Sequence, residues 1–87
     1  MSADLDAVRR AIREAVAGLE NQTERAAFEN AGALIELLTN EAIAVGKLRA
    51  NSAAQLRERE HLSLAGLADA LGISKTRADQ LVRLSRS

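Results

Sequence analysis

The C-terminal part of the chain carries polar and charged residues whose side chains suit hydrogen bonding to bases and phosphates. They are Ser74, Lys75, Thr76, Arg77, Asp79, Gln80, Arg83 and Arg86. Arginine can pair with guanine and glutamine with adenine. Asp79 is expected to be solvated or paired with a nearby arginine or lysine, and the alternative is that it accepts from a cytosine amine. Arg77 and Gln80 are three residues apart, so a helix would place both on one face. These residue types suit contacts with duplex DNA, with Arg77 and Gln80 suited to base edges and Arg83 and Arg86 to phosphate.

Two short helical patterns meet within this region, at residues 72–74. Leu67 and Leu71 are four residues apart and share one face of the first predicted helix. The small side chain of Ala68 would let the two helices approach closely. Gly72 favours the left-handed conformation that ends a helix. Ile73 would close the turn against the core.

Caps and inward-facing residues complete this pattern. Ser63 and Ser74 are each predicted to cap the helix that follows, because a serine hydroxyl can accept a hydrogen bond from a free backbone N–H. On the second helix, Ala78 and Leu81 are predicted to face inward, together with either Leu84 or Ser85. Leu56 is predicted to supply the inward contact from the preceding helix.

The run Leu-Ala-x-x-Leu-Gly-Ile-Ser at 67–74, followed by Ala78 and Leu81, resembles the helix-turn-helix of phage-type repressors. Residues 77–81 are also similar to the recognition helix of sigma-factor region 4. The resemblance covers about residues 51–86 and does not reach the first 45. It implies a three-helix unit whose last helix enters the major groove, so that residues 74–85 are the predicted reading segment. Ala78 departs from it, since a larger β-branched residue is common there. The alternative is an ordinary pair of helices joined by a glycine turn.

Charge is divided unevenly along the chain, although the formal net charge is zero. Residues 1–43 hold four arginines and eight acidic residues, a net charge of −4. Residues 44–87 hold eight basic and four acidic residues, a net charge of +4. The positive half contains the predicted reading segment, with further basic residues behind it, which are Lys47, Arg49, Arg57 and Arg59. This distribution suits one end that faces DNA and another that faces solvent or a partner, although chance clustering on a solvated surface is the alternative.

Composition limits the other possibilities. Eighty-seven residues make at most one small domain, and the absence of cysteine excludes disulfides and thiolate metal sites. No stretch resembles a signal peptide or a membrane span, so the expected location is cytoplasmic, without a membrane partner. Ten arginines against two lysines, with eighteen alanines, point to a bacterial genome rich in GC. With Phe28 as the only aromatic residue, stacking on single-stranded nucleic acid is not expected.

Catalytic and metal-binding patterns are weak. His61 is the only histidine, and Glu58 and Glu60 beside it would not share its helical face. His61 is therefore predicted to be a loop or capping residue. Ser63 and Ser74 are accounted for as caps, and no glycine-rich phosphate loop occurs. The sequence predicts neither an enzyme nor a metal site or cofactor.

The first 60 residues are predicted to form two helices. Apolar residues recur every three or four positions over about residues 4–19, and a second helix runs from about residue 22 toward residue 60. Asn21, with Glu24 three positions later, has the spacing of a capping box, and Thr23 is a rival cap. Possible bends in the second helix lie at residues 39–40, Gly46 and residues 51–52.

The second helix is apolar around too much of its circumference for one partner. One predicted stripe includes Phe28, Ile35 and Val45, and a displaced one includes Leu34 and Leu37. A second copy of the chain is the simplest cover, giving a bundle of four helices. A helix that breaks near Gly46 and folds back within a monomer is the alternative. The predicted dimer contacts are Phe28, Leu34, Ile35, Leu37, Leu38 and Val45.

The sequence thus predicts an all-α fold without a β-hairpin wing. Residues 1–45 form a helical hairpin for dimerisation, and its long second helix leads into a helix-turn-helix region at 46–87. The expected function is that of a homodimeric transcriptional regulator that binds double-stranded DNA sequence-specifically. The alternative is a protein-interaction module or accessory subunit, associated with RNA polymerase or with partition, that uses the long helix.

Overall fold

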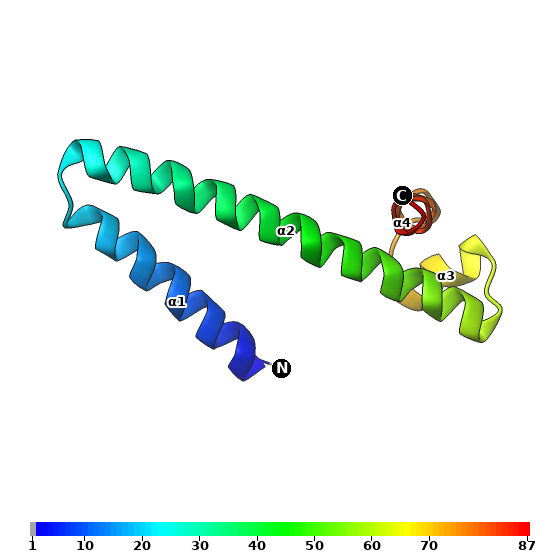
Figure 1. Cartoon of the computed structure of the whole chain (residues 1–87). Coiled ribbons are helices and arrows are strands. Elements are labelled where there is room, and N and C mark those ends of the chain that lie inside the picture. Colours follow the sequence, from blue (N-terminus) through cyan, green and yellow to red (C-terminus); the bar gives the residue numbers. More distant parts are fainter. Residues whose placement is uncertain (1) are drawn as a thin grey trace. The chain divides into compact units, whose positions relative to one another are not determined.

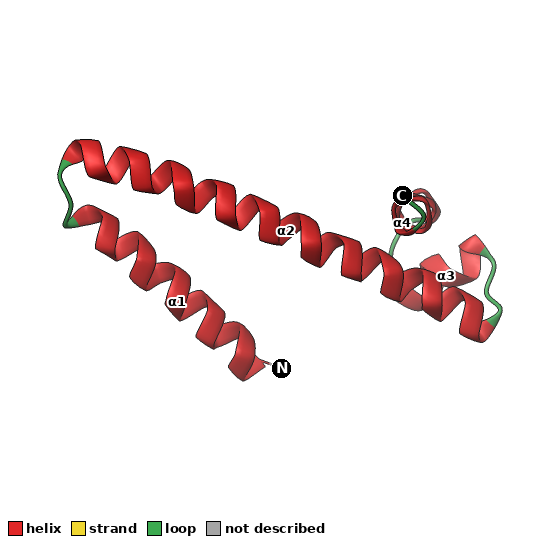
Figure 2. Ribbon diagram, viewed as in Figure 1, coloured by secondary structure: helices red, strands yellow, loops and turns green. Residues whose placement is uncertain are grey.

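The computed structural model describes residues 2–87, with side chains from residue 4 onward (Figure 1). Within that range the chain forms four α-helices and no strand, so the predicted all-α fold class is confirmed. The helices are α1 (Ser2–Glu20), α2 (Glu24–Glu60), α3 (Leu64–Leu71) and α4 (Lys75–Ser85). Short loops join them (Figure 2).

The start of α2 is capped by Thr23. Its hydroxyl oxygen accepts a hydrogen bond from the Ala26 N–H at 3.3 Å, which satisfies one of the free donors of the first turn. Of the two caps that the sequence offered, Thr23 is therefore the right one and the Asn21 capping box is wrong. The N–H of Asn21 instead bonds the carbonyl of Gly18, at 3.3 Å, in the turn that ends α1.

Helix α2 is continuous over 37 residues, and none of the three suggested bends interrupts it. Two of the residues suspected of breaking it bond to their own helix. The Thr39 hydroxyl donates to the Ile35 carbonyl at 2.8 Å, and the Ser52 hydroxyl donates to the Leu48 carbonyl at 2.9 Å. A hydroxyl that bonds back to the preceding turn lets such a residue stay in a helix interior.

The chain divides into two compact units, residues 1–39 and 40–87. In the first, none of the side chains from residue 4 to residue 39 is buried. Along α2 the half-buried apolar residues include Ala27, Ala31, Leu34 and Leu38, spaced four, three and four apart. This line includes Leu34 and Leu38, two of the predicted dimer contacts. Figure 1 shows the short turn that joins α1 to the start of α2.

The second unit contains all the buried side chains among those described. They come from α2, α3 and α4 and are Ala50, Ala53, Leu67, Ala68, Ala78, Leu81 and Val82. Larger apolar side chains surround them and are partly buried, namely Leu56, Leu62, Leu64 and Ile73. Four of these seven buried residues are alanines, whose small side chains allow close approach of the helix backbones. No buried polar side-chain atom within residues 4–87 lacks a hydrogen-bond partner.

The inward residues of α4 follow the sequence prediction in part. Ala78 and Leu81 are buried as predicted. Of the two candidates at the end of the helix, Leu84 is 44% exposed and Ser85 is half-buried, so Ser85 takes the inward position. Val82 is also buried, which the sequence analysis did not predict. Leu71 lies at the edge of the core and is 38% exposed, whereas Leu67 is fully buried.

Candidate nucleic-acid interface

Serine caps fix the starts of α3 and α4. The Ser63 hydroxyl accepts from the Gly66 N–H, and the Ser74 hydroxyl accepts from the Arg77 N–H, each at 3.0 Å. Both serines have the extended backbone of an N-cap. The two caps predicted from sequence are confirmed, and they fix the residue at which α4 begins.

The turn between α3 and α4 depends on Gly72. Its φ of 68° lies in the left-handed region that favours glycine. The Gly72 N–H bonds the Asp69 carbonyl at 3.3 Å, and the Ile73 N–H bonds the Ala68 carbonyl at 3.0 Å. These two bonds form a Schellman motif. Ile73 packs against both groups of buried residues, so the predicted closure of the turn against the core is confirmed.

The same motif ends α2, but with histidine in the left-handed position. His61 has a φ of 53°, and its N–H bonds the Glu58 carbonyl at 3.3 Å. The Leu62 N–H bonds the Arg57 carbonyl at 2.9 Å, and the Arg57 side chain donates from Nε to the Leu62 carbonyl at 3.1 Å. His61 is thus a turn residue. Among the described residues no three potential metal-ligating side chains cluster together.

The predicted DNA-contacting residues lie along α4 and at its two ends. Ser74 is the N-cap, the next six are on α4, and Arg86 follows it. Asp79 is half-buried and the other seven are exposed. Ala78, Leu81 and Val82 occupy the opposite side of the helix, against the core. The fold therefore leaves one polar side of α4 exposed to solvent.

Two contacts organise this polar side. The Arg77 guanidinium lies 3.5 Å from the Gln80 side-chain oxygen. Asp79 and Arg83 form an ion pair with a shortest distance of 3.0 Å. Arg77 and Gln80 are thus adjacent, as their spacing predicts, while Arg83 already has an anionic neighbour.

Two of the basic residues placed behind α4 bond to the protein's own backbone. Lys47 Nζ donates to the carbonyls of Leu84 at 2.8 Å and Ser85 at 3.4 Å, and also to that of Ser87. A cation at these carbonyls satisfies acceptors left free at a helix end. Arg57 bonds to Leu62, as described above. The sequence analysis treated Lys47 and Arg57 only as basic residues of the positive half. The contact of Lys47 could not be predicted, because its partners lie far along the chain and sequence spacing does not connect them.

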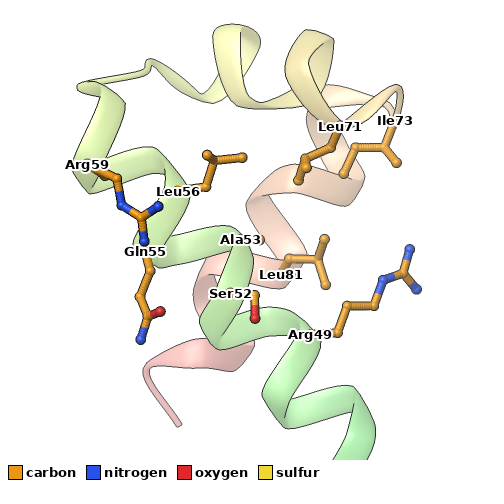
Figure 3. Close-up of a pocket in the computed structure, with 9 residues that line it drawn as sticks. All are labelled: Arg49, Ser52, Ala53, Gln55, Leu56, Arg59, Leu71, Ile73 and Leu81. Carbon is orange, nitrogen blue, oxygen red and sulfur yellow. The ribbon is translucent and has the colours of Figure 1, made fainter. Parts of the chain in front are cut away.

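Sequence reasoning also missed an open groove of about 480 Å³ on the second unit. Figure 3 shows the side chains that line it, which are Arg49, Ser52, Ala53, Gln55, Leu56, Arg59, Leu71, Ile73 and Leu81. We call it the α2–turn groove, because α2 supplies one wall and the α3–α4 region supplies the other. No sequence motif could have identified it, since its walls come from three helices and a turn.

The residues predicted to form a dimer lie on α2. Phe28 is 81% exposed and Ile35 is 65% exposed. Leu37 and Val45 are also exposed, while Leu34 and Leu38 are half-buried. Among the helices that the structure describes, none combines the length and apolar character needed to cross a bilayer.

Comparison with protein-family models, curated proteins and solved structures finds no match to this chain.

Proposed function

We propose that the protein is a homodimeric transcriptional regulator that binds double-stranded DNA sequence-specifically, with residues 74–85 in the major groove. The observation that carries this proposal is the polar side of α4. It displays Arg77 next to Gln80, with Lys75 in the first turn, on a helix whose start is fixed by the Ser74 cap and whose other side is anchored in the core. A helix presented in this way has the width that the major groove admits.

The polar residues of this surface fall into two groups, those that suit contacts with bases and those that suit contacts with phosphates. Arg77 and Gln80 are close enough to address neighbouring bases, and each bidentate pair contributes about 1–3 kcal/mol of discrimination. Lys75 at the first turn and Arg86 beyond the last turn suit contacts with phosphates. The N-terminal end of α4 adds the partial positive charge of its free N–H groups.

The homodimer is supported by the first unit. A folded unit without a buried side chain between residues 4 and 39 has little apolar burial to hold it. The exposed Phe28 and Ile35 leave apolar surface that a second copy would cover as a bundle of four helices. A symmetric dimer would also present two copies of α4 to half-sites about 34 Å apart, or a multiple of that spacing.

A second function uses the same exposed residues differently. In it, the apolar surface of α2 docks onto a larger partner, such as RNA polymerase or a partition complex, and α3–α4 is a scaffold. The observations that favour it are the exposure of Phe28 and the internal use of Lys47 and Arg57, which reduces the charge free for phosphate.

Selection of bound duplexes from a random pool, followed by measurement of affinity against salt, tests the first function against the second. If each protomer uses Lys75, Arg83 and Arg86, a dimer neutralises about six phosphates and the slope of log affinity against log salt is about −5. Recovery of a two-fold symmetric site with that slope supports the regulator. A slope near zero, or no enriched sequence, would contradict it.

A further inference from the structure

We infer that the α2–turn groove binds an acidic amphipathic helix of a protein partner. This inference concerns a surface outside the predicted reading residues, and it does not depend on DNA binding.

The floor of the groove is apolar. Leu56 of α2, Leu71 at the end of α3, Ile73 in the turn and Leu81 of α4 converge on it (Figure 3). Its volume of about 480 Å³ falls in the range of pockets that hold organic ligands, about 300–1,000 Å³. Aliphatic side chains from one face of a helix can fill such a groove.

The charges around the groove indicate which sign of electric charge its ligand should carry. Two arginines, Arg49 and Arg59, line it, and no acidic residue does. Neither arginine forms an ion pair within the part of the chain that the structure describes. Two cations without partners beside apolar side chains attract a ligand that is both apolar and anionic.

The separation of the two arginines favours a helix over a small acid. They are ten residues apart on one helix, so their backbones are about 15 Å apart. Figure 3 shows them on opposite sides of the apolar side chains. A ligand with a single carboxylate reaches only one of them. A helix with two leucines between two acidic residues, themselves about ten residues apart, places an anion at each arginine and the leucines on the floor.

An occupant of this groove would touch α4 and the turn before it, on the side of α4 away from the proposed DNA-contacting residues. Ile73 belongs to the turn that precedes α4, and Leu81 lies on α4 itself. The groove therefore offers a physical link between a partner protein and the position of α4. Its ligand shares negative charge with DNA but differs from it in needing apolar side chains that fill the floor.

A fluorescent helical peptide of about 16 residues, with two central leucines and glutamates about ten residues apart, is the probe. We expect saturable binding to the full-length chain by anisotropy. The double variant Arg49→Gln, Arg59→Gln should weaken peptide binding about ten-fold or more. The control Arg10→Gln removes one positive charge from an exposed residue of α1 and should leave the affinity within about two-fold of the wild-type value. Far-UV circular dichroism would verify that each variant stays helical.

Three results would overturn the inference. One is absence of saturable binding to the wild-type chain. Another is equal affinity for a peptide with glutamine in place of both glutamates, which needs no variant protein. The third is dodecanoate binding as tightly as the peptide with the same dependence on the two arginines, since that would assign the groove to a small organic acid.

Discussion

Asp79 and Arg83 form an ion pair across one turn of α4, with Oδ2 of the carboxylate 3.0 Å from Nε of the guanidinium. An exposed pair at this spacing contributes only about 0.3–0.5 kcal/mol to helix stability. Its larger effect concerns ligands, because it places a negative charge on the proposed DNA surface and gives Arg83 a competing partner. The net charge that α4 offers to phosphate is therefore smaller than its basic residues suggest.

Replacing Asp79 with alanine should strengthen DNA binding without regard to sequence. The change removes a repulsive charge beside Arg83, so affinity should rise, while the slope of log affinity against log salt should stay near the wild-type value because the number of neutralised phosphates is unchanged. Affinity for random duplex, measured by anisotropy over a range of salt, is the readout. Asp69→Ala on the exposed side of α3 makes the same charge change away from α4 and should have little effect. Equal effects of the two substitutions would place DNA elsewhere.

Arg77→Ala and Gln80→Ala should relax the preference at one base pair in each half-site, because each removes a side chain that reads a base edge. The loss of discrimination should be about 1–3 kcal/mol at that position. Arg83→Ala, in contrast, should weaken binding to all sequences alike and flatten the salt dependence. Competition with single-base variants of a selected site distinguishes the two patterns. If Arg77→Ala and Gln80→Ala lower affinity evenly across those variants, α4 does not read bases with these residues.

Ile35→Asp should abolish self-association. The side chain is 65% exposed in the single chain, so the substitution does not disturb contacts within it, but it would bury a charge between two copies. Sedimentation equilibrium at micromolar concentration should give twice the chain mass for the wild type and the chain mass for the variant. Asn40→Asp adds the same charge at another exposed position of α2 and should remain dimeric. A dimeric Ile35→Asp variant would exclude this face from the interface.

Introducing glycine at one Schellman turn and removing it from the other should change the stability of the chain in opposite directions. His61→Gly should stabilise the chain by up to about 1 kcal/mol, because histidine pays for a positive φ that glycine adopts freely. Gly72→Ala should destabilise by about 1–2 kcal/mol through the backbone alone, since an added Cβ would contact nothing within 4 Å. Each kcal/mol moves the melting temperature by about 4–8 °C.

A control at Gly32 separates backbone strain from a general effect of losing glycine. Gly32 lies inside α2 without a positive φ, and a Cβ there also meets nothing within 4 Å. Gly32→Ala should therefore stabilise by about 0.5–1 kcal/mol, the difference in helix propensity. A loss of stability from both alanine substitutions would contradict the assignment of strain to the turn at Gly72.

The features that sequence predicted correctly are local ones. Ser63, Gly72 and Ser74 act on backbone groups within a few residues, so residue type and spacing suffice to place them. The bond from Lys47 to the Leu84 carbonyl joins residues 37 positions apart, and only the packing of α4 against α2 brings them together. The α2–turn groove could not be predicted from sequence for the same reason, since packing brings its lining residues together from distant parts of the chain. Asn21 failed as a cap because the nearby Thr23 meets the first turn at the correct position.

The small buried residues restrict the ways in which this protein can evolve. Ala50 and Ala78 have no exposed surface, so any substitution other than glycine must enlarge the side chain where two helices meet. Such overpacking costs about 1–3 kcal/mol. Phe28, by contrast, is largely exposed within one chain. If nothing covered it, packing would not prevent its replacement by polar residues during evolution. Related sequences that keep a large apolar residue at that position while their other exposed residues vary would therefore record selection imposed by a partner rather than by the fold.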